Sequence, residues 1–537
     1  METLNLNVGL LGHVDSGKTS IAKCLSTTSS TACFDKNPQS QERGITIDLG
    51  FSSLSTDLPE RLIQAKSKWT KLQFTLVDCP GHASLIRTII GGAQIIDMMM
   101  LVIDINKGVQ TQTAECIVIG EITSKPLIIV LNKIDLIDEG KQAVVIAKVK
   151  KKLQLTLANT CFKNAPIVAI AANPGGQEEN IRQAKEVLKE TSFIPERHPD
   201  KPMVFSVDHC FSIKGKGTIL TGTILQGTIK VNDNIELPAL QLIKKVKSIQ
   251  IFHQNIDEAV QGDRIGLCVT QFDPKSMERG VACVPGYLSR LYAAVISVAK
   301  VKYYKQQLTS KTKYHITVGY NTVLSKTTFF TSSQIDKNTG FNIISEYKHA
   351  EMLDDSNIDG VEQCYALVEF EKSVISCENG LIIGSKLDMD IHSSTCRIAF
   401  YGSIIWGIAD KNYVANILPT IKIFKSKEKV GVIHRMVNNY EVIGQALFKK
   451  ETKMQVFQNL RVSLSTGEMG VIESSFGQGG KVKIRFPDGL KLETITQLSK
   501  KGNKNNEDIN EKGKEPIKVI LRFKKFIFDK KKLIVQN

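Results

Sequence analysis

The residues with the most specific chemistry lie in the segment GHVDSGKT, from Gly12 to Thr19. Glycine-rich loops of this spacing direct successive backbone N–H groups at one point and so bind phosphate. Lys18 can reach the β- and γ-phosphates of a nucleotide, and the Thr19 hydroxyl can ligate Mg²⁺. The predicted phosphate-binding residues are Asp15, Ser16, Gly17, Lys18, Thr19 and Ser20.

An acidic and a hydroxyl side chain later in the chain complete a predicted Mg²⁺ site. Asp78 opens the segment DCPGH, directly after the apolar run KLQFTLV, and its carboxylate can hold Mg²⁺ through water. In the same segment, the Gly81 N–H can contact the γ-phosphate. Thr46, within ERGITID, lies 27 residues beyond Thr19 and is the candidate for the second hydroxyl on Mg²⁺.

The segment NKID, residues 132–135, predicts which base the nucleotide carries. The Asp135 carboxylate can accept hydrogen bonds from N1–H and the exocyclic amine of guanine, a donor pair that adenine lacks. Asn132 and Lys133 of the same segment are the neighbouring residues of the predicted base site. Because the four segments occur in order, each at a strand end or in a loop, they predict a GTPase that uses GTP and Mg²⁺.

The elements that must position these residues follow from the hydrophobic pattern. Between residues 4 and 190, apolar runs alternate with helical stretches, which predicts a mostly parallel sheet wrapped by helices. A proline-rich linker at 194–202 ends this region, and short runs from Met203 onward predict a small β-barrel. The predicted domains are residues 1–197, 198–288, 289–407 and 408–537. The predicted fold class is an α/β P-loop GTPase domain followed by two β-barrels and a basic, mainly β domain.

The composition limits the class of protein. The chain has 537 residues, of which 42% are hydrophobic and 23% charged, as in a soluble globular protein. No run approaches the 18 apolar residues of a membrane helix, so no membrane contact is predicted. The opening residues form a strand and a loop rather than a signal peptide, and the eleven cysteines include no CxxC pair. We therefore expect a cytoplasmic protein without a disulfide framework or a zinc ribbon.

Positive charge is concentrated in one part of the chain. The net charge is +16, and residues 409–537 alone carry 26 Lys and Arg against 13 Asp and Glu. Such a concentration predicts contact with a polyanion. The segments KIFKSKEK and RFKKFIFDKKK predict β-strands whose exposed face touches RNA backbone. The alternative is a solvated surface that only aids solubility. The stretch SKKGNKNNEDINEKGKE, residues 499–515, predicts a disordered loop in this region.

One strand of the predicted small barrel carries an acid and an imidazole side by side. In FSVDHCFSIKGKGT, period-two geometry puts Phe205 and His209 on one face and Asp208 on the other. Both polar side chains can then enter one pocket only through a bulge or at a strand end. The alternative is a satisfied core histidine beside a surface aspartate.

The order and spelling of the four nucleotide segments resemble the translational GTPases, among them elongation factor Tu. The resemblance implies that His82, the histidine of DCPGH, orients the attacking water in GTP hydrolysis. It also implies that two apolar residues, Val14 and Ile45, hold this histidine back until the ribosome docks. The sequence departs from the pattern at Ser16, where the general elongation factors carry histidine. It also has Ala171-Ala172-Asn173 in place of the usual base-supporting motif, and the resemblance implies that Ala172 and Asn173 belong to the base site.

Over nearly the whole chain, the sequence resembles the selenocysteine-specific elongation factors. The resemblance is strongest in DKNPQSQERGITIDLGFS, VDHCFSIKGKGT, VTQFDPKSMERG, GSKLDMDIHSSTCRIAFYG and LSTGEMGVIESSFGQGGKVKI. The family's amino-acid pocket maps onto Asp208, His209 and Arg264. General elongation factors have aspartate in place of His209 and asparagine in place of Arg264, so the pocket here is more basic. Because a selenol is a stronger acid than a thiol, selenocysteine is largely an anion at neutral pH, and a basic pocket favours it over serine.

The resemblance implies a monomeric elongation factor that binds GTP and selenocysteinyl-tRNA and delivers the tRNA to the ribosome at recoded UGA codons. The basic region resembles the fourth domain of the eukaryotic and archaeal members. That likeness implies a separate protein that binds the selenocysteine insertion (SECIS) hairpin.

Several alternatives share parts of this pattern. A general aminoacyl-tRNA elongation factor would have an acidic or neutral pocket and no fourth domain. The tRNA-binding initiation GTPase would carry zinc-knob cysteine pairs, which are missing here. A GTPase subunit of sulfate activation would leave the basic β region unexplained. A non-hydrolysing RNA-binding scaffold would not need the intact Lys18, Thr19 and His82.

Overall fold

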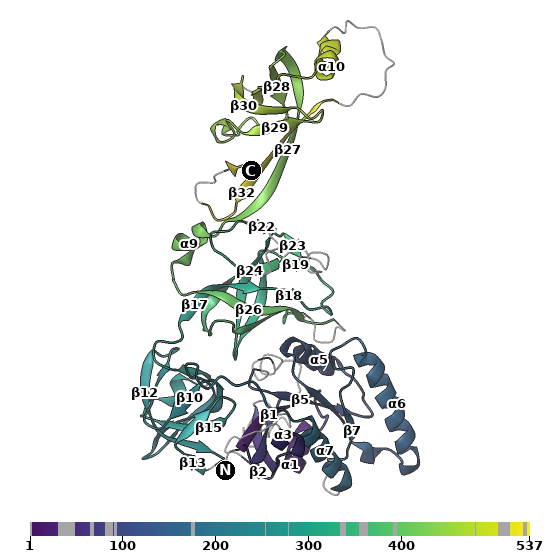
Figure 1. Ribbon diagram of the computed structural model, residues 1–537, viewed down its shortest axis with the longest axis vertical. Coiled ribbons are helices and arrows are strands. Elements are labelled where there is room, and N and C mark those ends of the chain that lie inside the picture. The colour runs from purple at the N-terminus through teal and green to yellow at the C-terminus, as the bar shows by residue number, and fades with distance from the viewer. Residues whose placement is uncertain are drawn as a thin grey trace. The chain divides into compact units, whose positions relative to one another are not determined.

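The computed structural model divides into two compact units, which we describe separately (Figure 1). The larger unit comprises Met1–Thr328, Met352–Ile358 and Tyr365–Lys411, and the smaller comprises Phe329–Glu351, Asp359–Cys364 and Asn412–Asn537. The structure describes residues 3–29, 49–64, 69–80, 90, 94–172, 178–252, 254–277, 279–332, 340–353, 363–389, 395–477, 479–502, 516–529 and 534–536. Within these residues, no helix is both long and apolar enough to cross a membrane. The division into four domains stays a prediction.

A mostly parallel sheet forms the first part of the larger unit and confirms the predicted α/β fold. In the described residues its strands run in the order β2-β3-β4-β1-β5-β6-β7, and the five from β4 to β7 are parallel. The antiparallel strands β2 and β3 complete one edge. The strands are β1 (Thr3–Leu11), β2 (Thr28–Ser29), β3 (Gly50–Asp57), β4 (Lys71–Asp78), β5 (Met98–Asp104), β6 (Leu127–Asn132) and β7 (Ile167–Ala169).

Helices pack on this sheet because its central strands are apolar runs. All residues of β5 are buried, as expected for a parallel strand that is covered on both faces. The helices are α1 (Lys18–Leu25), α3 (Glu60–Gln64), α5 (Thr111–Thr123), α6 (Glu139–Leu157) and α7 (Glu178–Thr191). Ile21 of α1 and Leu188 of α7 share one buried core with alternate residues of β1. The carboxyl ends of β1, β4, β5 and β6 meet at one edge, where the predicted nucleotide segments follow them.

A second sheet of the larger unit closes on itself and forms the predicted small barrel. Its order is β11-β16-β8-β9-β15-β12-β13, and the additional pairing of β11 with β12 closes the ring. Its strands are β8 (Val204–Ile213), β9 (Gly217–Gln226), β11 (Asn234–Leu237), β12 (Leu242–Ile251), β13 (Gln254–Ile256), β15 (Arg264–Val269) and β16 (Gly280–Cys283). A separate ribbon pairs β10 (Thr228–Lys230) with β14 (Glu258–Val260). The irregular segment 192–203 lies where the linker was predicted.

The second predicted barrel follows. Its strands run in the order β20-β25-β26-β17-β24-β21, and β20 also pairs with β21, which closes the ring. These strands are β17 (Arg290–Ser297), β20 (Thr312–Val318), β21 (Asn321–Ser332), β24 (Gln363–Ile375), β25 (Leu381–Ser385) and β26 (Ile398–Ile408). The short additions are β18 (Ala299–Lys300), β19 (Leu308–Thr309) and β23 (Met352–Leu353). Two barrels therefore follow the α/β part, as the sequence predicts.

The smaller unit is built mainly of β-strands, in agreement with the predicted fold class. Its strands run in the order β27-β28-β31-β30-β29-β32, and β27 also pairs with β32. Its elements are β22 (Tyr347–His349), α9 (Tyr413–Asn416), β27 (Ile423–Asn438), β28 (Glu441–Gln445), β29 (Arg461–Leu464), β30 (Met469–Phe476), β31 (Lys481–Arg485), α10 (Leu492–Gly502), β32 (Lys518–Phe526) and β33 (Ile534–Val535).

Alternation along β32 gives this unit an inner and an outer face. Val519, Leu521 and Phe523 are buried in the core of the unit, so the residues between them face outward. The predicted disordered loop at 499–515 begins too early, because residues 499–502 belong to α10. Residues 503–515 lie outside the described part of the chain.

Candidate nucleotide site and amino-acid pocket

The segment GHVDSGKT joins the end of β1 to the start of α1, as a phosphate-binding loop requires. Three of its residues have a left-handed backbone: Gly12 at φ 144°, Asp15 at φ 60° and Gly17 at φ 91°. A Cβ atom at Gly12 would lie 2.2 Å from the Val102 carbonyl oxygen, and one at Gly17 would lie 2.1 Å from Nδ2 of Asn132. Glycine is therefore required at both positions, and the turn can direct backbone N–H groups toward a phosphate.

Lys18, the first residue of α1, is buried beneath this loop. Its Nζ donates to the His13 carbonyl oxygen at 2.9 Å. Burial lowers the pKa of the Lys18 ammonium, while the charge of Asp78 acts in the opposite direction. A buried ammonium is costly without a counter-charge, and the phosphates of a nucleotide would supply one.

Two of the three predicted Mg²⁺ ligands lie together. The Thr19 hydroxyl donates to Oδ2 of Asp78 at 2.5 Å, and Asp78 is buried. Mg²⁺ prefers oxygen ligands, so a hydroxyl and a carboxylate at this separation fit the ion, directly or through water. Thr46, the third predicted ligand, lies outside the described residues, as do Gly81 and His82.

Asn132 joins the predicted base site to the phosphate-binding loop. Its Nδ2 donates to the Ser16 carbonyl oxygen at 2.9 Å, and its Oδ1 accepts from the Ala172 N–H at 3.1 Å. Asp135 is exposed within a short 3-10 helix (Ile134–Leu136), so its carboxylate is open to a ligand. Asn173 lies outside the described residues.

The remaining residues of the predicted phosphate site lie on the loop that precedes α1 or, for Ser20, in the first turn of α1. Ser16 is buried, Val14 is half-buried, and Asp15 and Ser20 are exposed. Val14 therefore has the partial exposure that one side of a hydrophobic gate needs. Ile45, the other residue of that gate, lies outside the described residues, so the gate stays a prediction.

Two further residues of this site were not singled out from the sequence. Asp104 ends β5 as Asp78 ends β4, and its carboxylate pairs with Nζ of Lys133 at 2.9 Å. His13 is buried, burial lowers the pKa of its imidazole, and neither ring nitrogen has a hydrogen-bond partner among the described residues. The strand-end position is a sequence signal for Asp104. Burial of His13 depends on the packing around it and gives no such signal.

The predicted amino-acid pocket contains the bulge that its geometry demands. Strands β8 and β9 pair Val207 with Gly222 and His209 with Thr221, so Asp208 is an extra residue in β8. The extra residue interrupts strict alternation and brings His209 to the face that carries Thr221. A Cβ atom at Gly222 would lie 1.9 Å from a carbonyl oxygen of β8, so only glycine allows this close pairing opposite the bulge.

Asp208 and Arg264 form a buried ion pair in this pocket. Nη1 of Arg264 donates to Oδ2 of Asp208, whose Oδ1 accepts from the Thr221 hydroxyl at 2.9 Å. The two charged side chains are 5% and 4% exposed. The guanidinium carbon of Arg264 also lies 3.1 Å from the centre of the Phe51 ring in β3, which is a cation–π contact.

The ion pair changes the roles expected for the pocket residues. Strict alternation predicts that Asp208 points away from the pocket. In the structure, the Asp208 carboxylate instead contacts Arg264, orients the guanidinium and compensates its positive charge. His209 is half-buried, and its ring makes no ion pair or hydrogen bond to any other described residue. His209 is therefore the more accessible basic group. Sequence analysis missed Thr221 and Phe51, because both reach the pocket only through tertiary contacts.

A polar junction fixes the small barrel against the α/β part of the larger unit. Arg197, in the segment between α7 and β8, donates to both carboxylate oxygens of Asp97 at 2.9 and 2.7 Å. Nδ2 of Asn5 and Nδ2 of Asn7 donate to the Gly262 carbonyl oxygen at 2.8 and 2.9 Å. Gly262 lies just before β15, so the junction also positions the strand that begins with the pocket arginine.

Known families match three regions of the chain. The elongation factor Tu GTP-binding domain matches residues 3–256, the third domain of eukaryotic selenocysteine-specific elongation factors matches 295–402, and the eEFSec C-terminal RIFT domain matches 419–532. The selenocysteine-specific elongation factor of Mus musculus is 49% identical over 579 aligned residues, which cover 99% of each chain. The chain belongs to the selenocysteine-specific elongation factor family.

Archaeal members of the family are also similar. The selenocysteine-specific elongation factor of Methanocaldococcus jannaschii is 32% identical and matches 91% of this chain and 96% of its own. The crystal structure of translation elongation factor SelB from Methanococcus maripaludis, in complex with a GTP analogue, has a TM-score of 0.69 at 26% identity. It covers 97% of this chain and 98% of its own. The Tu-type GTP-binding domain and the family confirm the prediction of a translational GTPase.

Proposed function

We propose that the chain binds GTP with Mg²⁺ and selenocysteinyl-tRNA, and delivers this tRNA to the ribosome at recoded UGA codons. GTP is hydrolysed on correct decoding. The observation that carries the proposal is the bulge at Asp208, which brings His209 and the Asp208–Arg264 pair to one face of the small barrel. Membership of the family supports the same function.

The nucleotide site would recognise phosphate and base separately. The backbone of residues 12–19 and Lys18 would hold the phosphates, and Asp135 would accept from the guanine base. Thr19 and Thr46 would hold Mg²⁺, with Asp78 acting through water. When bound, the ion would neutralise charge on the β- and γ-phosphates.

GTP hydrolysis would depend on an attacking water that the protein orients only after the ribosome docks. The proposed orienting residue is His82, which follows β4 in the segment DCPGH. Val14 and Ile45 would keep this imidazole away from the water until the ribosome docks. Such an arrangement acts mainly in the transition state, so it would raise turnover without tightening GTP binding.

The pocket would distinguish amino acids by their charge. A guanidinium has five N–H donors, and Asp208 occupies one of the two on Nη1, so Arg264 keeps donors for a second anion. The selenolate of selenocysteine could accept from those donors and from a protonated His209. Serine brings a neutral hydroxyl, which compensates less of the basic charge. A charge-assisted contact of this kind is worth about 1.5–3 kcal/mol, or about ten- to a hundred-fold in affinity.

The smaller unit would contact RNA on the ribosome or on the tRNA. KIFKSKEK lies largely in β27 and RFKKFIFDKKK begins in β32, and these two strands pair antiparallel from Phe424 with Phe526 to Val432 with Lys518. Val519, Leu521 and Phe523 of β32 are buried, so Lys518, Arg522 and Lys524 occupy the outer side of the strand. We also propose a monomer in the cytoplasm that acts with a separate protein bound to the SECIS hairpin.

Filter binding tests this function. One tRNA is charged with selenocysteine or with serine, and the dissociation constants of both forms are measured with GTP present. We expect the selenocysteinyl form to bind about ten- to a hundred-fold more tightly. Equal affinities would contradict the proposal, because discrimination would then not depend on the amino acid.

A further inference from the structure

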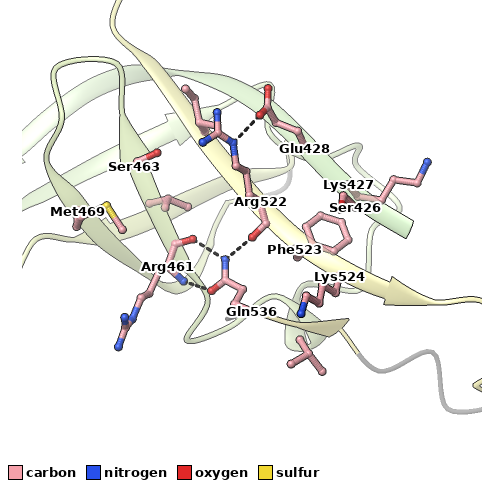
Figure 2. Close-up of a pocket in the computed structure, with 13 residues that line it drawn as sticks. Ser426, Lys427, Glu428, Arg461, Ser463, Met469, Arg522, Phe523, Lys524 and Gln536 are labelled. Atoms are coloured by element: carbon pink, nitrogen blue, oxygen red, sulfur yellow. Dashed lines mark hydrogen bonds and ion pairs between the residues drawn. The ribbon is translucent and has the colours of Figure 1, made fainter. Parts of the chain in front are cut away.

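The outer face of the smaller unit carries a groove that neither site described above uses. Its lining residues come from strands β27, β29, β30, β32 and β33 and from Gln536, and many of them are labelled in Figure 2. Its volume is about 670 Å³. The residues that matter for its chemistry are Lys427, Glu428, Arg461, Arg522, Lys524 and Gln536. Four of these six carry a positive charge and one a negative charge.

Two walls of the groove present arginine. Arg522 and Lys524 lie on the outer side of β32, because Leu521 and Phe523 point into the core, and the two are about 6.6 Å apart along the strand. Arg461 begins β29 on the opposite wall and is exposed. Among the described residues, the Arg461 guanidinium has no ion-pair or hydrogen-bond partner.

The acidic side chains near the groove compensate only part of this charge. Glu428 accepts from Nε of Arg522 at 2.7 Å, and Glu346 pairs with Nζ of Lys524 at 2.7 Å. The Arg522–Glu428 pair is exposed, and exposed ion pairs contribute little to stability, whereas the Lys524 side chain is only 19% exposed. A phosphate group can therefore compete with Glu428 for the Arg522 guanidinium.

A single side-chain amide joins the two arginine-bearing strands. Oε1 of Gln536 accepts from the Arg461 N–H at 2.6 Å. Its Nε2 donates to the carbonyl oxygen of Arg461 at 2.8 Å and to that of Arg522 at 2.7 Å. Figure 2 shows this amide between the two main chains. The side chain thus makes the bonds that a peptide group of a neighbouring strand would make.

The position of this amide in the sheet explains why it is needed. Strand β29 pairs with β32 only as far as Ile520, and β33 pairs with β32 at Lys524 and Lys525. Arg522 lies between these two pairings, so its carbonyl oxygen would have no strand partner on that side. Gln536 fills the gap and fixes the separation of Arg461 and Arg522.

We propose that Gln536 is a positioning residue that holds Arg461 and Arg522 on opposite walls of a groove for the phosphodiester backbone of RNA. This inference rests on the proposed RNA contact of the smaller unit and assigns it to particular residues. RNA fits better than an acidic protein segment for two reasons. Arg522 and Lys524 lie one two-residue step apart on the outer side of β32, so they can contact neighbouring charges of a polyanion. Residues 409–537 also carry 26 Lys and Arg against 13 Asp and Glu.

The test uses the full chain and fluorescence anisotropy with a labelled oligouridine RNA at several salt concentrations. Gln536→Leu removes three hydrogen bonds without changing the charge, and Arg461→Gln removes the unpaired cation. We expect each to weaken RNA binding about three- to tenfold at physiological salt. Arg461→Gln should also lower the log–log salt slope by about one. Lys450→Gln is the matched control, because this exposed lysine lies outside the groove.

A variant with both substitutions tests whether Gln536 affects RNA binding by positioning Arg461. If Gln536 acts through Arg461, then Gln536→Leu combined with Arg461→Gln should bind RNA no more weakly than the weaker single variant. Fully additive losses would contradict a positioning role. GTP affinity should stay unchanged in every variant. If Gln536→Leu prevents the smaller unit from folding, Arg461→Gln and Arg522→Gln decide the question, since both side chains point outward.

Each other outcome has a distinct meaning. Unchanged RNA affinity and salt slope in Arg461→Gln and Gln536→Leu would overturn the groove but leave RNA contact elsewhere on the unit. Failure of the wild-type chain to bind oligouridine would overturn the proposed RNA contact itself. If an oligoglutamate peptide binds instead, and Arg461→Gln abolishes that binding, the groove belongs to an acidic protein partner and the assignment to RNA is wrong.

Discussion

The nucleotide site and the amino-acid pocket of this chain are assembled by different means. Three of the four predicted nucleotide segments follow a strand end of the α/β sheet, at β1, β4 and β6, and parallel strands bring such ends to one edge. The pocket depends on one β-bulge, on the glycine opposite it and on a phenylalanine from the α/β part. A motif therefore suffices to locate the first site, whereas the second depends on strand register.

The two sites also differ in how they carry positive charge before a ligand binds. Lys18 donates to a main-chain carbonyl, and burial lowers the pKa of its ammonium. Arg264 pairs with the carboxylate of Asp208 and stacks on Phe51. The nucleotide site thus needs the negative charge of a ligand to compensate the Lys18 ammonium. In the pocket, Asp208 already compensates Arg264, so an anionic ligand must share the guanidinium with this carboxylate. We therefore expect substitutions in the nucleotide site to cause the largest losses of GTP hydrolysis or GTP affinity. Substitutions in the pocket should cause smaller losses of tRNA affinity that depend on the amino acid that the tRNA carries.

The largest effect should come from His82→Ala. This change removes the group proposed to orient water, so ribosome-stimulated GTP hydrolysis should fall about 10²- to 10⁴-fold. Binding of GTP and of tRNA should remain nearly intact, because the imidazole acts in the transition state. Single-turnover hydrolysis with ribosomes, beside equilibrium binding, measures both. Parallel losses of binding and turnover would make His82 structural instead.

Asp135→Asn should change the base specificity. The carboxylate that accepts from the guanine donor pair becomes an amide, so GTP affinity should fall about a hundredfold, while xanthosine triphosphate should bind better. Nucleotide competition measures the two affinities. Asp138→Asn is the control, because Asp138 is exposed three residues away and pairs with Lys141 at 3.1 Å. Wild-type affinity for GTP in Asp135→Asn would remove base recognition from this position.

His209→Asp combined with Arg264→Asn should erase most discrimination in the pocket. The ratio of dissociation constants for seryl- and selenocysteinyl-tRNA should fall by about ten- to a hundred-fold, since both basic groups are lost. GTP hydrolysis should be unaffected without tRNA. Lowering the pH through the selenol pKa should narrow the wild-type ratio as the ligand loses its charge. The same ratio in both proteins would mean that tRNA shape, not charge at these residues, carries the discrimination.

The smallest effect should come from Thr221→Val, which tests the bulge itself. The change removes the hydrogen bond that holds Oδ1 of Asp208, at a cost of about 1 kcal/mol in the free energy of unfolding. Because Asp208 then holds Arg264 less firmly, the ratio of the two tRNA affinities should change only a few-fold. Thr327→Val is the control, since Thr327 is a buried threonine of β21 whose hydroxyl has no hydrogen-bond partner among the described residues. Identical behaviour of the two variants would remove Asp208 from the pocket's function.

The sequence by itself determined the parts of this protein that depend on short-range patterns. Apolar runs followed by glycine, aspartate or asparagine predict both the parallel sheet and the residues at its edge, because each strand end carries its own functional group. Alternating runs predict the barrels in the same way. The resemblance to the family identified Asp208, His209 and Arg264 as one pocket, which composition and periodicity do not reveal.

Only the tertiary structure decided how those pocket residues meet. Asp208 and Arg264 are 56 residues apart, and their pairing requires an extra residue in β8 whose presence depends on the register with β9. Phe51 reaches Arg264 from another part of the larger unit, and Gln536 reaches Arg461 across 75 residues. The physical reason is the same in each case. A residue's own segment sets its local conformation, but its contact partner is set by strand pairing and packing over the whole fold.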